Sequence, residues 1–208
     1  MRIAVIGAGS VGQALGRGWT KAGHQVVFGI PDPSPARYPK LAAAQLQQPA
    51  AAVGGADVIV LATPWDKTEA AIASLGDLKD RILIDCTNPL TMTPAGMGLA
   101  LGFESSAAER IAQWAKGAAV FKTLNQTGAD NMDRAGDFAV RPAMFVAGDD
   151  DAKKPVVMQL LRDLAFEPID AGPLANARLL EPLAMLWIDQ ALRRGRGRDF
   201  AFALVRRG

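Results

Sequence analysis

Three glycines near the start of the chain, Gly7, Gly9 and Gly12, form the pattern GxGxxG within "GAGSVG". The pattern directly follows an apolar, β-branched stretch at 2–6 and opens a segment with helical periodicity, which is typical of a strand, a tight turn and a helix. In such a unit the first glycine permits the turn, the second lets backbone approach a pyrophosphate, and the third lets the helix pack closely on the strand. The spacing therefore predicts a dinucleotide site, and the alternative is a strand-to-helix turn without a ligand.

Three later loops could line the same site, because each follows an apolar stretch that reads as a strand. These loops are "ATPW", "CTNPL" and "KTLNQTG", and ligands of open parallel sheets lie outside the carboxyl ends of the strands. The hydroxyls and amides could form hydrogen bonds, the prolines could stiffen the loops, and the tryptophan could lie against a sugar or a ring. The candidate residues are Thr63, Pro64, Trp65, Asn88, Pro89, Thr123 and Asn125. Ordinary turn chemistry is the alternative for each of them.

Few side chains are suited to acid–base or metal chemistry. The single histidine, His24, lies in a predicted turn, and the single cysteine, Cys86, lies in an apolar strand. We therefore expect neither a Ser-His-Asp system nor a zinc site. Lys122 ends a predicted strand and could be a proton donor or belong to a structural ion pair, and we assign no catalytic residue. The inventory suits hydride transfer, in which a cofactor carries the reactivity and the protein aligns it and excludes water.

The position that normally distinguishes the two nicotinamide cofactors lies in "FGIPDP", just after the second predicted strand. An acid here binds the ribose hydroxyls of NAD, whereas a nearby arginine accommodates the 2′-phosphate of NADP. Ile30 occupies this position beside the expected ribose and can do neither. Arg37 and Lys40, further along the loop, could reach a 2′-phosphate. We therefore expect a modest preference for NADP, with NAD left open.

The order of predicted elements indicates an α/β fold with a Rossmann-type, doubly wound parallel sheet. A small C-terminal α/β extension ends in a long helix from Ala175 to about Gly195, where Pro182 predicts a kink or a later helix start. We expect a dinucleotide-binding Rossmann domain at 1–142 and the extension at 143–208, with one continuous domain as the alternative. The predicted strands lie at 2–7, 24–29, 56–64, 81–89, 118–124, 143–148 and 166–172.

Composition excludes several functional classes. The 23 Lys and Arg residues against 21 Asp and Glu give a net charge of +2, which is too small for a general nucleic-acid binder. No apolar run approaches the roughly 18 residues of a membrane span. We therefore expect a cytoplasmic protein that acts on small molecules, without a nucleic-acid or membrane partner.

The loops described above, together with "DCTNPL", "KTLNQTGADNM", "AGDD" and "DAGPLANARLLEPLAMLW", resemble the NADPH-dependent reductases of deazaflavin coenzyme F-420 and their bacterial relatives. The resemblance extends over the whole chain, and the last of these stretches is its most specific part. The cytosolic domains of the ferric reductases called six-transmembrane epithelial antigens of prostate look similar.

The resemblance implies direct hydride transfer between NADP and a stacked deazaflavin or flavin ring, without a catalytic base. It also implies a homodimer. The nicotinamide would lie near Asn88 and Pro89, and the residues implied to hold NADP are Ala8, Gly9, Ser10, Val11, Thr63 and Pro64. Two positions depart from the family: Ile30-Pro31 stands where Ser-Arg is common, and Asn125 stands where archaeal members often have histidine.

Two further hypotheses accompany an NADP-dependent oxidoreductase with a small-molecule redox carrier. The chain could be a nucleotide-binding sensor without turnover, because Ile30-Pro31 lacks the expected polar groups. A hydroxyacid dehydrogenase fits poorly, because such enzymes typically add a large helical domain for which the residues after Pro142 are too few. At helical spacing the C-terminal segment carries an apolar face that could be buried internally or against a partner, formed by Leu179, Leu183, Leu186 and Trp187.

Overall fold

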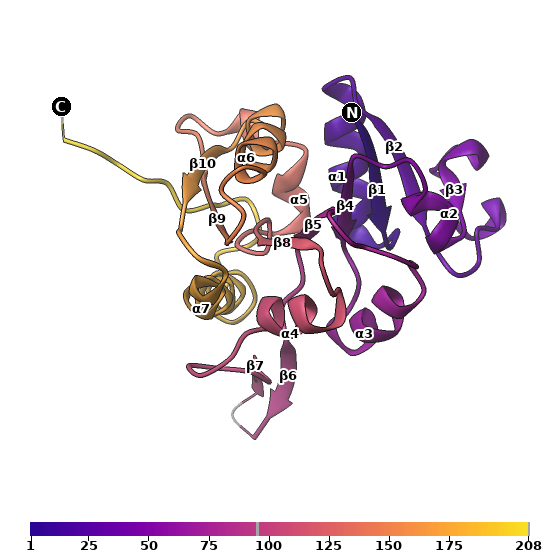
Figure 1. The fold of residues 1–208 in the computed structure, drawn as a ribbon. Helices are drawn as coiled ribbons and strands as arrows, with labels where there is room; N and C mark the ends of the chain where they lie inside the picture. Colours follow the sequence, from indigo (N-terminus) through magenta and orange to yellow (C-terminus); the bar gives the residue numbers. More distant parts are fainter. Residues whose placement is uncertain (95, 208) are drawn as a thin grey trace.

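An eight-stranded sheet runs through the molecule in the order β10-β9-β8-β5-β4-β1-β2-β3 (Figure 1). The computed structural model describes residues 1–94 and 96–207. The strands of this sheet are β1 (Arg2–Ile6), β2 (Gln25–Gly29), β3 (Leu46–Gln47), β4 (Val58–Leu61), β5 (Ile82–Asp85), β8 (Ala119–Lys122), β9 (Ala143–Gly148) and β10 (Glu167–Asp170). Continuous apolar runs form the central strands, as expected where both faces of a sheet are buried.

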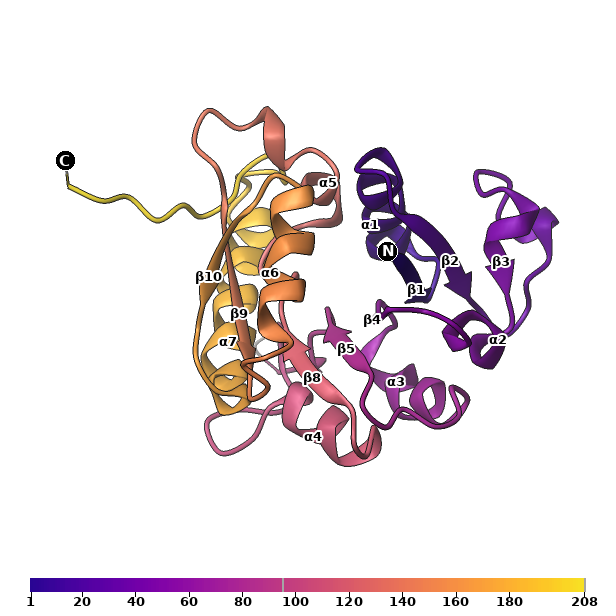
Figure 2. The same ribbon diagram turned by 45° about the horizontal axis from the view of Figure 1, so that its top comes forward.

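Helices cover both faces of this sheet (Figure 2). The helices are α1 (Ser10–Lys21), α2 (Pro49–Val53), α3 (Trp65–Ala73), α4 (Ala107–Trp114), α5 (Ala129–Met132), α6 (Lys154–Asp163) and α7 (Ala177–Ile188). One core cluster contains side chains of α1, α5 and α6, and a second contains side chains of α2, α3, α4 and the start of α7. The predicted α/β, doubly wound arrangement is confirmed.

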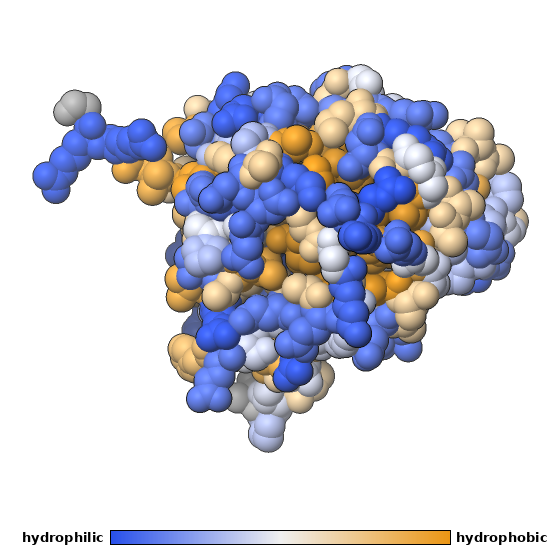
Figure 3. All heavy atoms as spheres, in the orientation of Figure 1, coloured by the Kyte–Doolittle hydropathy of each residue, from blue (hydrophilic) through white to orange (hydrophobic). Residues whose placement is uncertain are grey.

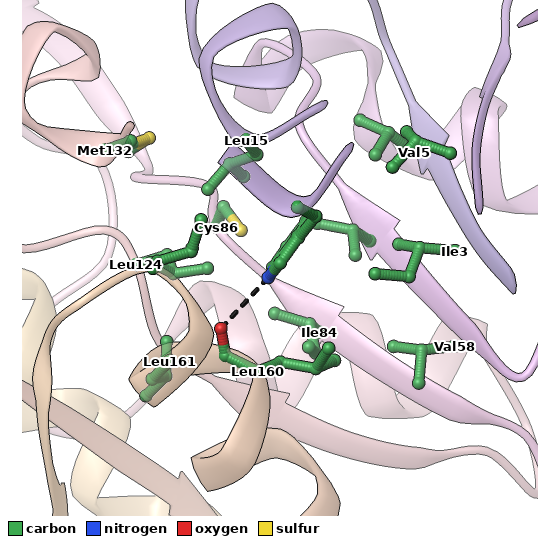
Figure 4. Close-up of a cluster of buried hydrophobic side chains, with 14 of the residues drawn as sticks. Ile3, Val5, Leu15, Val58, Ile84, Cys86, Leu124, Met132, Leu160 and Leu161 are labelled. Carbon is green, nitrogen blue, oxygen red and sulfur yellow. Dashed lines mark hydrogen bonds between the residues drawn. The ribbon is translucent and has the colours of Figure 1, made fainter. Parts of the chain in front are cut away.

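The core beneath α1 is anchored by Trp19, which is fully buried. Its indole Nε1 donates to the carbonyl oxygen of Leu160 in α6 at 3.0 Å, which is the dashed line in Figure 4. Because a buried indole N–H needs an acceptor, this bond fixes α6 against α1. The glycine loop is therefore attached to a helix that both the sheet and α6 hold in place.

The last two strands run opposite to the rest of the sheet. Six strands from β3 to β8 are parallel, β9 is antiparallel to β8, and β10 is parallel to β9. The connection after β8 returns to the sheet without a full crossover, and the side chain of Gln126 donates to and accepts from the backbone of Phe145 at 3.0 Å each. Gln126 thereby binds the backbone N–H and carbonyl of Phe145, a residue of β9 that is not paired with β8. The sheet is continuous across the expected boundary at 142/143.

The long C-terminal helix begins with a short 3₁₀ turn at Leu174–Asn176, continues as α7, and ends in a π-type turn at Asp189–Arg193. The predicted helix is confirmed. Because Pro182 lies inside α7, the alternative of a helix start after this proline is wrong. Beyond this helix the C-terminal segment extends away from the body (Figure 1), and its outer residues are hydrophilic (Figure 3).

A two-stranded hairpin of β6 (Leu90–Thr93) and β7 (Gly96–Leu99) has no counterpart among the predicted elements. It projects from the body below α4 and α7 in Figure 1. Arg193 Nη2 donates to the carbonyl oxygen of Met97 at 3.0 Å, which ties the hairpin to the end of the C-terminal helix.

Candidate functional site

The three glycines of the loop between β1 and α1 are present for different structural reasons. Gly7 has φ +107°, and a Cβ at this residue would lie 2.5 Å from the carbonyl oxygen of Ala62. A Cβ on Gly12 would overlap the carbonyl oxygen of Gly7. Gly9 has ordinary extended backbone, and a Cβ there would have no atom within 4 Å. Turn geometry and packing therefore explain Gly7 and Gly12, whereas Gly9 faces open space.

The N-terminus of α1 is left open by the protein. Within the described part of the chain no side chain caps it, and its first turn contains no acidic residue. The amide of Gln13 donates to the carbonyl oxygen of Ala8 at 2.8 Å, which fixes the loop without using the backbone N–H groups of Ser10 and Val11. The first N–H groups of a helix have no intrahelical partner, and the helix dipole favours an anion near them. This end of α1 is therefore suited to a phosphate group.

A cleft of about 500 Å³ lies at the carboxyl ends of β1, β4 and β5. The glycine loop, the start of α3 and the loop after β5 form its walls. Its lining residues are Gly9, Ser10, Val11, Ala62, Thr63, Pro64, Trp65, Asp66, Cys86, Thr87, Asn88 and Leu90. Seven residues that the sequence predicted for the site meet here, namely Gly9, Ser10, Val11, Thr63, Pro64, Trp65 and Asn88.

Thr63 and Trp65 are held from behind the cleft. Thr63 Oγ1 lies 2.9 Å from the hydroxyl of Thr68, which donates to the carbonyl oxygen of Pro64 at 3.0 Å. The Trp65 ring packs against Trp114 of α4 with a centroid distance of 5.4 Å. These contacts hold the loop after β4 in one conformation while Trp65 remains partly exposed.

Asn88 and Asn125 connect the loops that follow β5 and β8. Asn88 Nδ2 donates to the carbonyl oxygen of Asn125 at 3.0 Å, and Asn125 Nδ2 donates to Asn88 Oδ1 at 3.1 Å. Asn125 Nδ2 also lies 3.1 Å from the carbonyl oxygen of Leu180 in α7. Asn125 is thus a buried connector behind the cleft, and Asn88 is the member of the pair that lines it. Leu124, just before Asn125, has φ +61°, a strained conformation of the kind found at functional sites.

The remaining predicted residues lie outside the cleft. Gly7, Ala8 and Gly12 belong to the loop behind Gly9, and Pro89 is buried at the start of the hairpin.

Ile30 is only 2% exposed, its side chain belongs to the core beside α1, and its N–H donates to the carbonyl oxygen of Gln47 at 3.0 Å. Asp32, two residues on, pairs with Arg37 at 3.0 Å. Core packing and strand pairing therefore explain Ile30.

A buried charged triad of Asp85, Lys122 and Glu181 lies behind the cleft. Lys122 Nζ is 2.9 Å from Asp85 Oδ2, 3.1 Å from Glu181 Oε1 and 2.6 Å from the carbonyl oxygen of Thr87. The backbone N–H of Thr87 donates to Asp85 Oδ1 at 2.8 Å. The triad therefore fixes the backbone N–H and carbonyl of Thr87, which lines the cleft. Lys122 belongs to an ion-pair network, and its fully buried side chain has no exposed atom from which to donate a proton.

Glu181 joins the triad to a helix end. Its carboxylate accepts from the backbone N–H groups of Ala107 and Ala108, at 3.1 and 3.3 Å, at the N-terminus of α4. Burial raises the pKa of Glu181 against the opposing attraction of Lys122. Burial alone would lower the pKa of Lys122, but attraction by Asp85 and Glu181 outweighs it, so the pKa is raised. Lys122 therefore stays charged inside the protein.

Sequence reasoning missed five lining residues of the cleft and two members of the triad. Ala62, Cys86, Thr87 and Leu90 lie within the loops "ATPW" and "CTNPL" but were not among the candidate residues, and Asp66 directly follows the first of these loops. Burial raises the pKa of the Cys86 thiol, which favours its protonated form. Asp85 and Glu181 lie far apart in sequence, and only their position in the fold reveals them.

Residues 1–94 and 96–207 contain no helix with the length and hydropathy that a membrane span requires. No group of three or more His, Cys, Asp or Glu side chains among them could hold a metal ion.

Residues 2–89 match the family model described as NADP oxidoreductase coenzyme F420-dependent. A solved structure from Arthrobacter sp. FB24, provisionally assigned as an F420-dependent NADP-reductase, is 32% identical, with a TM-score of 0.90 and coverage of 99% of this chain and 100% of that one. A hypothetical protein from Sinorhizobium meliloti, SMa0349, is 25% identical, with a TM-score of 0.72 and coverage of 87% and 90%.

Metalloreductase STEAP3 of Rattus norvegicus is 28% identical over 190 residues. This similarity covers 89% of the present chain but only 37% of the length of the rat protein. The glycine loop, the open end of α1 and the cleft lie in the part of the fold that these relatives share. The chain therefore belongs to the coenzyme F420-dependent NADP oxidoreductase family and is an NADP-dependent oxidoreductase.

Proposed function

We propose that NADP(H) binds across the N-terminus of α1 and that the chain passes hydride between it and a deazaflavin such as coenzyme F420, or a flavin. Two features support this fit. A Cβ on Gly9 would enter open space beside the cleft, where backbone can approach a pyrophosphate. The first turn of α1 has neither a side-chain cap nor an acidic residue among the described residues.

The side chains that line the cleft are the observation that supports hydride transfer. The lining is largely apolar, and its titratable side chains are Asp66 and Cys86. Asp66 is mostly exposed and lies 3.2 Å from Lys67 Nζ, while the Cys86 thiol has a raised pKa. Neither is suited to proton transfer, and hydride exchange between two rings needs none. NADP supplies the hydride chemistry when bound, and the walls orient the rings and exclude water.

The experiment is an acceptor panel with a binding control. Oxidation of NADPH is followed with a deazaflavin, free flavins and ferric chelates, and NADPH affinity is measured separately by titration calorimetry. Turnover with a deazaflavin or flavin, lost in the Gly9→Val variant, supports the proposal. Binding of NADPH without oxidation by any acceptor contradicts it and favours a sensor, the second candidate suggested by the apolar Ile30-Pro31 pair.

We also propose that α7 forms a homodimer contact. Leu179 and Leu186 are 67% and 50% exposed on the outer side of this helix, whereas Trp187 on the inner side is 5% exposed. The four apolar residues grouped from the sequence therefore divide between two faces, and Leu183 is partly exposed between them. Sedimentation of the wild type and of Leu186→Glu tests this contact, because a buried carboxylate would weaken association. A wild type that stays monomeric at micromolar concentration contradicts it.

A further inference from the structure

The hairpin of β6 and β7 has two chemically different sides. Successive residues of a strand point to opposite sides, and residues paired across an antiparallel ladder share a side. We call one of them the apolar side of the hairpin, because it carries only leucine and methionine. The pairs on the apolar side are Leu90–Leu99 and Met92–Met97, and those on the other side are Thr91–Gly98 and Thr93–Gly96.

The side with the glycines faces the end of the C-terminal helix. A Cβ on Gly96 would overlap the guanidinium of Arg193, and β7 lies against α7. The hydroxyl of Thr93 donates to the carbonyl oxygen of Gly96 at 2.8 Å, within the hairpin itself. Because Gly96 has no side chain, Arg193 can approach the backbone and donate to the carbonyl oxygen of Met97. The apolar side therefore points away from Arg193.

The apolar side is exposed and continues the wall of the cleft. Leu90 lines the cleft and is 36% exposed, and Met92 is 74% exposed. Strand geometry places Met92 about 7 Å further along the hairpin than Leu90. None of the four apolar residues belongs to a core cluster of the described chain. A single exposed apolar residue is ordinary, but four paired ones that begin at the rim of an apolar cleft extend that cleft outward.

We infer that the apolar side of the hairpin packs against the ring of the redox carrier that exchanges hydride with NADP(H), and that Met92 positions this ring. This inference rests on the proposed function. A nicotinamide in the cleft covers one face of a stacked ring, and the rest of that ring needs an apolar surface adjoining the cleft. Leu90 belongs to both the cleft and the hairpin, so the two surfaces are continuous.

The side chains of this surface fit an uncharged planar ring. A thioether is polarizable, makes favourable contacts with aromatic rings, and adapts its shape to rings of different outline. A phosphate or a sugar would lose hydrogen bonds to water against these side chains without gaining others. The apolar side therefore favours the ring of a carrier over its polar tail.

The test measures ring binding separately from turnover. Dissociation constants of riboflavin and 8-hydroxy-5-deazaflavin, which present the ring without a charged tail, are determined by fluorescence quenching with saturating NADP⁺. We expect Met92→Gln to weaken both rings by about fivefold or more, because an apolar contact is replaced by an amide without a partner. Met92→Leu keeps an apolar side chain of similar volume and should stay within about twofold of the wild type. NADPH affinity, measured by calorimetry, should change by less than about twofold, because Met92 is not among the residues that line the cleft.

Thr91→Gln is the matched control. It introduces the same side chain at the preceding residue of β6, on the opposite side of the hairpin. Its ring affinity should stay within about twofold of the wild type, as for a surface substitution away from the ligand. Sedimentation of the wild type and of Met92→Gln shows whether the substitution changes the association of copies.

Three results would overturn the inference. Unchanged ring affinity in Met92→Gln, or equal weakening in Thr91→Gln, removes the ring from the apolar side. A dimeric wild type that becomes monomeric in Met92→Gln assigns this side to a contact between copies instead. If NADPH oxidation by a deazaflavin or flavin persists in these cases, the proposed function stands and only the inference fails.

Two further results separate the inference from the proposed function. If Met92→Gln weakens ring binding as expected but the wild type transfers no hydride to either ring, the ring site stands and the proposed function fails. A wild type that binds neither ring contradicts both.

Discussion

The N-terminus of α1 and the buried triad both lie at strand ends of one sheet, but the protein treats their polar groups in opposite ways. At α1, within the described chain, no side chain caps the first turn, and Gly9 faces open space. In the triad, Lys122 has three acceptors for its three N–H groups, and Glu181 also accepts from a helix end. The backbone N–H groups at the start of α1 are therefore available to a ligand. The polar groups of the triad are hydrogen-bonded within the protein and fix the walls of the cleft.

The largest effect on stability should come from removing the cation of the buried triad. Lys122→Met leaves two carboxylates buried without their cation, which should lower the free energy of unfolding by about 3–5 kcal/mol. Denaturant titration measures this loss. Combining it with Asp85→Asn and Glu181→Gln should recover part of the stability. A single variant as stable as the wild type would show that the triad does not hold the strand ends.

Binding of NADPH at the uncapped N-terminus of α1 should stabilise the folded protein. NADPH at about one hundred times its dissociation constant should raise the free energy of unfolding by about 2.7 kcal/mol. Gly9→Val should show no such gain, because its side chain enters the space that backbone needs for the pyrophosphate. Thermal unfolding with and without NADPH measures both. An equal gain in the two proteins would remove the glycine loop from the site.

Two glycines of one loop sharpen the comparison further. Gly12→Ala places a Cβ against the carbonyl oxygen of Gly7 and should cost about 1–3 kcal/mol of stability. Gly9→Ala meets no atom within 4 Å and should stay within about 0.5 kcal/mol of the wild type. Denaturant titration in the absence of nucleotide separates the two. If Gly9→Ala were less stable than Gly12→Ala, the assignment of Gly12 to packing and Gly9 to ligand binding would be wrong.

The smallest effect is expected at the partly buried ion pair between Arg178 of α7 and Glu109 of α4. Arg178 donates to both oxygens of Glu109, and these hydrogen bonds lower the pKa of the carboxyl against the opposing effect of burial. Its contribution should be complete above the ordinary pKa of 4.5 and lost as pH falls through the lowered folded value. Glu109→Gln should therefore cost about 1 kcal/mol or less at pH 7, and this cost should shrink as pH falls through the lowered folded pKa. A cost that persists in acid would exclude this electrostatic origin.

The sequence predicted the parts of the fold that depend on local pattern. Apolar runs identified all seven predicted strands, and the glycine spacing identified the turn from β1 into α1. The loop residues at the carboxyl ends of β4 and β5 gather as expected, because a parallel sheet brings those ends to one edge.

Other features depend on contacts between distant segments. The direction of β9 could not be predicted, because parallel and antiparallel strands share an apolar pattern. The hairpin of β6 and β7 is short and rich in glycine, which weakens its strand signal. Asn125, predicted as a ligand residue, is buried and donates to the carbonyl oxygen of Leu180, which lies 55 residues away in the sequence. The partners of Lys122 lie 37 and 59 residues away, at Asp85 and Glu181.

The position of Glu181 also bears on the order in which the molecule is completed during synthesis. Its carboxylate reaches Lys122 and the first amides of α4, which are made long before α7 emerges. Among the described residues that precede α7, Ser106 caps the N-terminus of α4 and Asp85 is the charged partner of Lys122. A nascent chain that stops before α7 therefore leaves the strand ends incompletely neutralised. We expect the final compact state to form only after release of this last helix, so that unfinished chains stay accessible to proteases.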